Sequence, residues 1–233
     1  MGKQDAPQAT LESIAYEELK NALIIGVYAP GSQIVEEVVA TQLEMSRSPV
    51  RVAIKQLEAE GFLEKHSNKR IYVARGNARK TISILQIREA LDGMAARLAA
   101  LNRDEEDMQQ FQRLMAEMDA CVDDKNVLSA YRAGFRMHYA IYNAGKNAEL
   151  AKMASSVLER ESITSYRSLQ QDTQRVSASQ SEHAEIVKAI IEQDAETAEQ
   201  LAREHIRKLI RRAEQLAEQE STQTSLLSML GEM

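Results

Sequence analysis

The chain has 233 residues, of which 44% are hydrophobic and 27% charged, and both fractions are ordinary for a soluble globular protein. The formal net charge of −6 argues at first against a nucleic-acid partner. A single cysteine, Cys121, excludes an internal disulfide framework, and the longest apolar stretch, 22–29, is far shorter than the ~20 residues that span a bilayer. Because the first ten residues also lack the basic and apolar regions of a signal peptide, we expect a cytoplasmic protein with no membrane partner.

The first predicted elements are three helices. Apolar residues at helical spacing predict a helix over 11–25 and a short second helix over 36–43. A tight link, 44–47, leads to a third helix. Ser48 is predicted as its N-cap and Pro49 as its first helical residue, where a missing N–H costs nothing.

A short hairpin is predicted to follow the third helix, which Gly61 ends. The segments 62–65 and 71–74 have the composition of strands, and the residues 67–69 between them favour a turn. Three helices followed by a hairpin predict a winged helix-turn-helix domain over residues 10–76.

The remainder of the chain shows helical periods and no strand signal. Short turn-like breaks separate the predicted helices, which favours an antiparallel all-helical bundle in a second domain, 79–220. The fold class is therefore mainly α. The six predicted helices cover 80–101, 105–122, 126–144, 147–169, 174–193 and 195–219.

Positive charge gathers in the first domain although the whole chain is acidic. Between Arg47 and Arg75 seven Lys and Arg residues stand against three Glu, a local charge of +4 that leaves −10 on the rest. A basic patch on an acidic body orients a protein on DNA and limits its non-specific binding. The charge pattern therefore predicts a nucleic-acid partner for the first domain only.

The third helix offers the side chains for reading DNA. In a helix-turn-helix the second of two closely linked helices enters the major groove, N-terminal end first. Arg47, Arg51 and Lys55 lie there at four-residue spacing, and arginine can bind guanine O6 and N7 through two parallel bonds. The alternative is a solvated helix face, with these cations paired to residues such as Glu58.

Phosphate contacts are expected on both sides of that helix. Ser46 and Ser48 can bind phosphate at its start, together with the backbone amides. The hairpin tip can reach the minor groove or flanking phosphates. The candidate contact residues of this tip are His66, Asn68, Lys69 and Arg70.

The first domain resembles the GntR family of bacterial regulators over roughly residues 10–75. The resembling run is Pro30-Gly31-x-x-Ile34-x-Glu36-x-x-Val39-Ala40-x-x-Leu43-x-Met45-Ser46-Arg47-Ser48-Pro49-Val50-Arg51, continued by Leu57-Glu58-x-Glu60-Gly61-Phe62-Leu63. The resemblance implies a winged helix-turn-helix that binds double-stranded operator DNA through the residues matching Arg47, Ser48 and Arg51, and through the wing. One departure is Arg70, which stands where the family usually has glycine.

The second domain resembles the FCD branch of the same family over most of 80–210. The resembling stretches are Arg88-x-x-Leu91-Asp92-x-x-Ala95-Ala96-x-Leu98-Ala99-Ala100, then 138–147, then 183–205. The resemblance implies a homodimer that senses a small organic acid. Arg88 is the candidate effector-binding residue, because a guanidinium holds a carboxylate in two parallel bonds. The alternative for Arg88 is a surface pair with Asp92 one turn away.

Three of the four histidines of the chain fall in this second domain. His183 and His205 are each eleven residues from Asp194. If Asp194 is the turn of a helical hairpin, both lie at the same height, roughly 16 Å from the bend at a rise of about 1.5 Å per residue. His138 from another helix can complete a three-nitrogen site for a divalent metal such as Zn²⁺.

The metal site departs from the branch it resembles. Many FCD members have an aspartate ligand one turn before the first histidine, and in this chain that position is Gly134. Three histidines still suffice for a metal with open positions, which water or an acidic effector can fill. The alternative is three buried histidines that hydrogen-bond around a metal-free ligand.

Three functions are compatible with these features. The first is a ligand-responsive, homodimeric transcription regulator that is not an enzyme. The second is a metal-dependent hydrolytic enzyme, since a three-histidine centre can activate water, although no recognisable motif supplies an acid or base beside it. The third is a dimeric DNA-binding protein without an effector, in which the helical half only dimerises.

Overall fold

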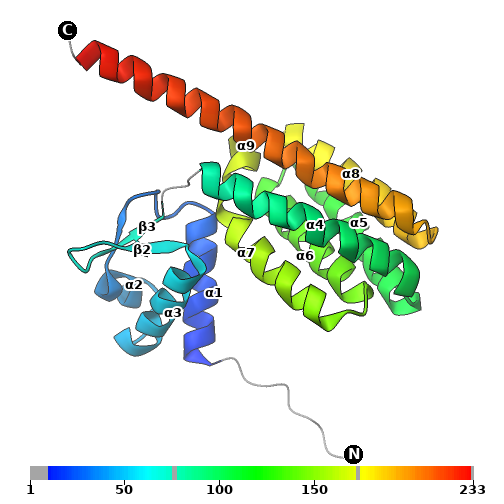
Figure 1. Ribbon diagram of the computed structural model, residues 1–233. Helices are drawn as coiled ribbons and strands as arrows, with labels where there is room; N and C mark the ends of the chain where they lie inside the picture. Colours follow the sequence, from blue (N-terminus) through cyan, green and yellow to red (C-terminus); the bar gives the residue numbers. More distant parts are fainter. Residues whose placement is uncertain (1–9, 75–77, 172–173, 232–233) are drawn as a thin grey trace, which may run out of the picture. The chain divides into compact units, whose positions relative to one another are not determined.

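The computed structural model describes the backbone of residues 10–74, 78–171 and 174–231, and their side chains except at 78, 162–171, 174 and 219–231. The chain divides into two compact units, Met1–Gly76 and Asn77–Met233 (Figure 1). Within the described residues no helix combines the length and the apolar character needed to cross a bilayer.

The first unit has three helices and a small antiparallel sheet. Its elements are α1 (Leu11–Ile24), β1 (Gln33–Ile34), α2 (Glu36–Gln42), α3 (Arg47–Glu60), β2 (Leu63–Lys65) and β3 (Ile71–Val73). The strand order is β1-β3-β2, with Leu63 opposite Val73 in the hairpin and Ile34 opposite Ile71 on the other side. This arrangement confirms the predicted winged helix-turn-helix.

The core of the first unit forms where α1 packs on α3. Leu19 and Leu23 of α1 and Ile54 and Leu57 of α3 are buried, each pair at a spacing that puts both side chains on one helix face. Burying side chains of this size is worth about 1.5–3 kcal/mol each. Because α3 is held by this apolar face, its opposite face is left to solvent.

The start of α3 differs from the prediction by two residues. Ser46 takes the N-cap position with extended backbone, although its side chain makes no capping hydrogen bond, and the helix begins at Arg47. Ser48, predicted as the N-cap, lies inside the first turn. Pro49 is accommodated at the third helical position because the first four N–H groups of a helix have no partner within it. Gly61 ends the helix as predicted, with a φ of 85° that favours glycine.

The second unit is a bundle of helices, as predicted. Its helices are α4 (Ala78–Asn102), α5 (Glu105–Asp123), α6 (Val127–Ala144), α7 (Ala148–Gln171), α8 (Gln174–Ile191) and α9 (Ala195–Gly231). The boundaries agree with the predicted ones within three residues except at the end of α9. We predicted that helix to end at 219, where the sequence turns rich in Ser, Thr and Gln, but the helical backbone continues to Gly231.

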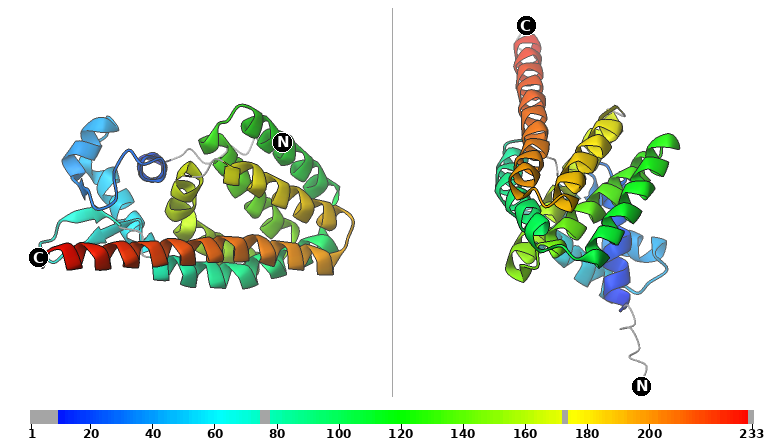
Figure 2. Two further views of the ribbon diagram at one scale, coloured as in Figure 1. Left: turned by 90° about the horizontal axis from the view of Figure 1, so that it is seen from above. Right: turned by 90° about the vertical axis from the view of Figure 1, so that its right-hand side faces the viewer.

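Small residues let α4 and α9 approach closely, and the two helices run side by side in Figures 1 and 2. Ala95 and Ala99 of α4 and Ala198 and Ala202 of α9 are buried in the core. At Gly93 an added Cβ would lie only 2.7 Å from Cγ of Arg203 on α9, so this contact requires glycine or a shifted arginine. The close packing makes α4 and α9 one wall of the bundle.

Polar caps fix the turns between the helices. Asp104 and Asp107 form a reciprocal capping box at the start of α5, and the backbone N–H of Thr197 donates to Oδ1 of Asp194 at the start of α9 (3.0 Å). The turn at Asp194 folds α9 back along α8. This turn sets which residues of the two helices face each other.

Candidate nucleic-acid interface and histidine pocket

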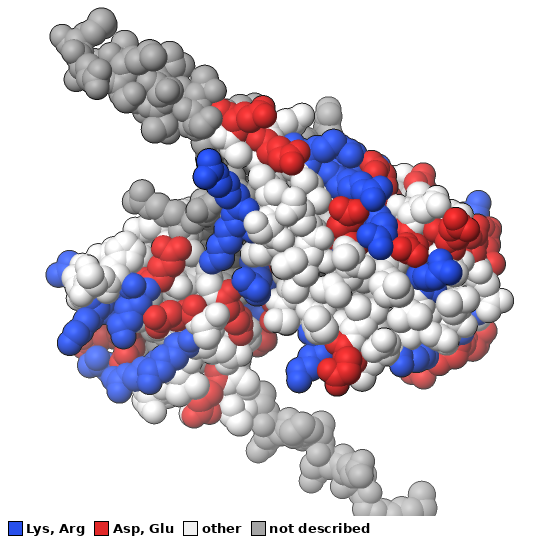
Figure 3. All heavy atoms as spheres, viewed as in Figure 1, with Lys and Arg blue, Asp and Glu red and all other residues white. Residues whose placement is uncertain are grey.

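The solvent face of α3 carries the predicted cations. The side chains of Arg47 and Arg51 are 58% and 55% exposed, and Lys55 is exposed one turn further along. Ser46 and Ser48 are exposed at the start of the helix. Figure 3 shows basic side chains gathered over the part of this unit where Figure 1 draws α3 and the hairpin. The helix thus presents a cationic front end to solvent.

Glu36 binds the two arginines of that face, a contact that our sequence reasoning missed. Nε of Arg51 donates to Oε2 of Glu36 (3.0 Å) and Nη2 donates to Oε1 (2.8 Å), while Nε of Arg47 donates to the same Oε1 (3.1 Å). These hydrogen bonds hold the pKa of the Glu36 carboxyl below its usual range. Glu36 belongs to the segment that resembles the GntR family, but its partners Arg47 and Arg51 are 11 and 15 residues away, so local spacing did not reveal the contact.

The hairpin tip is an exposed turn held by its own backbone. The N–H of His66 donates to the carbonyl of Arg70 (3.0 Å), and the N–H of Arg70 donates to Oδ1 of Asn68 (3.0 Å). The left-handed residue of this turn is Lys69, with a φ of 63°, and not Arg70, where the family usually has glycine. The four predicted contact residues, His66, Asn68, Lys69 and Arg70, are all exposed. Because Asn68 accepts the hydrogen bond from the Arg70 N–H, its side chain also shapes the turn.

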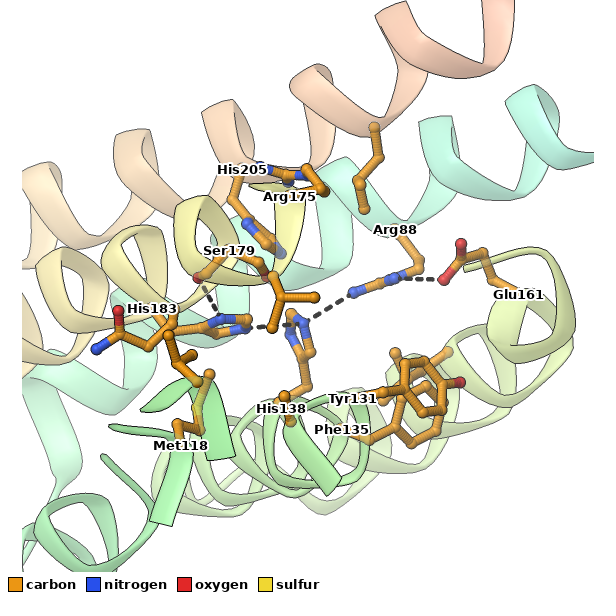
Figure 4. Close-up of a pocket in the computed structure, with 17 residues that line it drawn as sticks. Arg88, Met118, Tyr131, Phe135, His138, Glu161, Arg175, Ser179, His183 and His205 are labelled. Carbon is orange, nitrogen blue, oxygen red and sulfur yellow. Dashed lines mark hydrogen bonds and ion pairs between the residues drawn. The ribbon is translucent and has the colours of Figure 1, made fainter. Parts of the chain in front are cut away.

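Three buried histidines meet inside the second unit. His138 of α6, His183 of α8 and His205 of α9 each offer a ring nitrogen, and these atoms all lie within 4.8 Å of one another. The ring centroids of His183 and His205 are 4.7 Å apart, in line with their equal distance from Asp194. Figure 4 shows the three rings pointing toward a common space, with Arg88 beside them.

The hydrogen bonds of His183 and His138 leave Nε2 of each ring without a proton, here called bare, and these two nitrogens face each other. Nδ1 of His183 lies 2.7 Å from the carbonyl oxygen of Ser179, so it carries the proton and Nε2 is bare. Nε2 of His138 lies 3.2 Å from that nitrogen and 3.3 Å from Nη2 of Arg88, a donor, so it too is bare. If Nε2 of His138 carried a proton, that proton would face the N–H of Arg88 Nη2, and two donors would oppose each other. Nε2 of His138 therefore accepts from Arg88, and a cation bound at these two nitrogens would replace that hydrogen bond and use both lone pairs.

Burial keeps the three imidazoles neutral. Desolvation, with Arg88 and the neighbouring histidines adding to it, lowers the pKa of His183 to about 3 and holds the pKa of His138 well below its usual value. Desolvation also lowers the pKa of His205, although the neighbouring Glu182 opposes the shift. Neutral imidazole is the form that binds metal ions.

Glu182 supports the third histidine from outside the cluster. Nδ1 of His205 donates to Oε2 of Glu182 (2.6 Å), which leaves Nε2 of His205 for the cluster. Glu182 also accepts two hydrogen bonds from Arg175 and one from Lys208. Despite the cost of burial, these partners hold the pKa of Glu182 well below its usual range. Histidine ligands of metals are commonly oriented by such a carboxylate.

Arg88 enters the same pocket and is 2% exposed, so the surface alternative for it is wrong. Nη2 donates to Asp92 and Nη1 donates to Glu161 of α7, each at 2.9 Å. Burial opposes the charge of the guanidinium, but the carboxylates, Asp92 first, keep the pKa of Arg88 above its usual value. The alternative was correct in naming Asp92, whereas Glu161, 73 residues away, was not foreseen. Nε of Arg88 is buried without a hydrogen-bond partner among the described residues.

The pocket is small and mainly apolar beyond the histidines. Its cavity volume is about 60 Å³, room for roughly four or five water-sized groups. At Gly134 a Cβ would lie 3.7 Å from Cε1 of His183 and 3.9 Å from Cε of Met118, so a Cβ fits there without a clash. The apolar lining residues are Met118, Val122, Ala130, Phe135, Leu158, Val176 and Leu209.

Comparison with known families finds two models that match this chain in succession. The model described as "Bacterial regulatory proteins, gntR family" matches residues 11–73, and the model described as "FCD domain" matches residues 83–208. The second match alone covers more than half of the chain. The first match contains α3 and the hairpin, and the second contains all three histidines and Arg88.

Curated relatives and solved structures agree with these matches. The chain is 28% identical over 184 residues to the Nta operon transcriptional regulator of Aminobacter aminovorans, covering 78% of this chain and 84% of that protein. It is 32% identical to a probable D-xylose utilization operon transcriptional repressor of Paenarthrobacter nicotinovorans, with 76% of each chain covered. The E. coli McbR/YncC structure has the same fold, with a TM-score of 0.78 at 22% identity over 90% of this chain and 99% of that one.

Proposed function

This chain belongs to the gntR family of bacterial regulatory proteins and carries an FCD domain, and we propose that it binds operator DNA through α3 and the hairpin under the control of its histidine pocket. It is a transcription regulator and not an enzyme, because both family models and the curated relatives are of regulators. This finding contradicts the alternative of a metal-dependent hydrolase. Our proposal concerns three features of this regulator: the residues that read DNA, the bound metal and the effector.

The observation that supports DNA reading is the cationic front end of α3. Arg47, Arg51 and Lys55 are exposed on one helix face, while the opposite face is buried against α1. We assign Arg51 to base recognition and Lys55 to base or phosphate contact. The phosphates on either side of α3 would then be bound by Ser46, Ser48 and the hairpin tip. Binding by such a surface falls steeply with salt, because each phosphate contact releases counterions.

The observation that supports a metal is the pair of unprotonated nitrogens on His138 and His183, which face each other at 3.2 Å. With Nε2 of His205 they make a three-nitrogen set, and each ring has its other nitrogen directed at a carbonyl or carboxylate. Zn²⁺ or a similar divalent ion accepts three such ligands and keeps open positions. Bound there, the ion would supply positive charge for an anionic effector.

The charge balance of the pocket supports a carboxylate effector that binds together with the metal. With neutral histidines, the buried charges of Arg88, Asp92 and Glu161 sum to −1, which disfavours an anion. A divalent ion changes this sum to +1. An effector carboxylate can then bind the metal and Nε of Arg88, which has no hydrogen-bond partner within the described part of the chain, while the apolar lining receives the rest of a small molecule.

An apolar stripe on α4 supports a homodimer. Ile87, Met94 and Leu101 are 50%, 40% and 57% exposed, and their seven-residue spacing puts them on one face of the helix. Large apolar side chains in such a stripe mark an interaction surface. A second copy pairing through α4 would bring two DNA-binding units to the halves of a palindrome.

Binding measurements with metal and effector test this proposal. Purified protein is freed of metal with a chelator and then titrated with Zn²⁺ by calorimetry, alone and with small carboxylic acids. We expect one high-affinity site per chain, lost in His183→Ala, and a carboxylate that raises the melting temperature only with metal present. A protein that binds duplex DNA but neither metal nor any carboxylate would instead be the effector-free dimer.

A further inference from the structure

Glu36 occupies one edge of the Arg51 guanidinium and leaves the other edge open. As the first residue of α2, Glu36 reaches across to α3, where two hydrogen bonds of 3.0 and 2.8 Å join its carboxylate to Nε and Nη2 of Arg51. This paired geometry fixes the plane and the direction of the guanidinium as well as its position. No described residue accepts a hydrogen bond from Nη1 of Arg51, whose side chain is 55% exposed.

The open edge is the one that suits guanine. A guanidinium can make paired hydrogen bonds through its Nε–Nη2 edge or through its Nη1–Nη2 edge, and Nη2 has a second hydrogen for the latter. Guanine offers O6 and N7 in the major groove at the spacing of such a pair. With Glu36 on the first edge, the second edge of Arg51 is left without an acceptor for Nη1 among the described residues.

The same carboxylate also reaches Arg47. Its Oε1 accepts from Nε of Arg47 at 3.1 Å, so one acidic residue holds both arginines of the α3 front end. In water such exposed pairs contribute little to stability. A role in stability therefore does not account for an acidic side chain on a surface that meets polyanionic DNA.

We propose that Glu36 is a positioning residue for base recognition, which presents the Nη1–Nη2 edge of Arg51 to a guanine of the operator. This inference rests on the proposed DNA-binding function of α3. A pre-oriented arginine loses less side-chain entropy on binding than a free one. The negative charge of Glu36 also weakens attraction to phosphates in general, so the residue favours one sequence at the expense of non-specific binding.

Two neighbouring glutamates allow a test with a matched control. Glu36→Gln keeps the side-chain shape but replaces one acceptor with a donor, which breaks the paired contact with Arg51. Glu37→Gln makes the same change of charge at the next residue of α2, whose exposed side chain makes no ion pair with a described residue. Full-length wild type and both variants are each given a library of randomised DNA duplexes, and the enriched sequences are compared. Arg51→Ala identifies the base position that depends on Arg51.

We expect Glu36→Gln to lose guanine preference at the position that Arg51→Ala identifies, by roughly 5- to 10-fold. Affinity for unselected duplex should rise slightly and equally in both Gln variants, and Glu37→Gln should keep the wild-type preference. In the Arg51→Ala background, Glu36→Gln should change nothing further at that position. If Glu36→Gln tightens operator binding with its base preference intact, Glu36 is a competitor of DNA and the proposal is wrong. The same holds if the two Gln variants behave alike. Wild type that enriches no sequence and binds no duplex would refute the DNA-binding function itself.

Discussion

Replacing Gly134 by aspartate should strengthen metal binding in the histidine pocket. Gly134 lies one turn before His138 on the same face of α6, and the space measured there admits a Cβ without a clash. Because that Cβ lies beside the His183 ring, we expect the added carboxylate to reach toward the point where the histidine nitrogens converge. Aspartate also has slightly better helix propensity than glycine, so no backbone penalty is expected.

The size of the effect follows from charge and burial. Two unit charges about 4 Å apart interact by about 4 kcal/mol at an effective dielectric constant of 20, and a divalent ion doubles this value. Burying a carboxylate near Asp92 and Glu161 offsets several kcal/mol of that gain. A remainder of about 1.5–3 kcal/mol corresponds to a metal affinity 10- to 100-fold higher.

Calorimetric titration of chelator-treated protein with Zn²⁺ measures this difference. Gly134→Asn is the control, because it has the same size as aspartate without the charge, and it should leave the affinity near that of the wild type. The metal-free Gly134→Asp protein should melt at a lower temperature than the wild type, and the metal-loaded protein at a higher one. If Gly134→Asp and Gly134→Asn bind metal equally, the metal does not bind where the histidine nitrogens converge.

The remaining predictions concern four other positions. Arg51→Ala should weaken operator binding by about 1–3 kcal/mol in a fluorescence anisotropy titration with its melting curve unchanged, and an unaltered affinity would contradict the assignment of α3. His205→Ala should reduce metal content and the effector response while duplex binding in the absence of effector persists; full metal content by elemental analysis would exclude the three-histidine site. Asp194→Ala should lower the melting temperature at neutral pH, because it removes the hydrogen bond from the Thr197 N–H. That hydrogen bond holds the pKa of the Asp194 carboxyl below its usual 3.8. The carboxylate therefore stabilises the fold above pH 3.8, and this stabilisation is lost as the pH falls through the lowered pKa. A difference from wild type that stays constant down to the acid limit would argue against that capping role. Met94→Glu should shift the sedimentation coefficient toward that of a monomer, and a dimer of unchanged affinity would exclude the α4 stripe.

The helices could be predicted from the sequence because their signals are local. Apolar periodicity and turn residues predicted every helix of the second unit within three residues except for the end of α9, and they predicted the three helices and the hairpin of the first. The errors occur where local signals are weak or ambiguous. Ser46 and Ser48 are equally good N-cap residues, and a two-residue strand such as β1 shows no alternation.

The site could be predicted only in part, for the same reason. His183 and His205 are equally far from Asp194 in the sequence, and this spacing predicted that they meet. In a helical hairpin, residues equally far from the turn lie equally far along the two helix axes. Glu161, Glu182 and Glu36 could not be found in this way. Each is one glutamate among many, and it is distinguished only by partners that the fold brings from 11 to 73 residues away.

A salt titration of DNA binding tests the central claim most directly. The sequence enriched from the randomised duplex library is labelled, and its affinity for the wild-type protein is measured by anisotropy at increasing ionic strength. We predict that the logarithm of the affinity falls linearly with the logarithm of salt concentration, by about 0.9 for each phosphate contact. Lys55→Ala or Lys69→Ala should make this slope shallower if the replaced lysine binds phosphate. A protein with no measurable, salt-dependent affinity for any duplex would contradict the account.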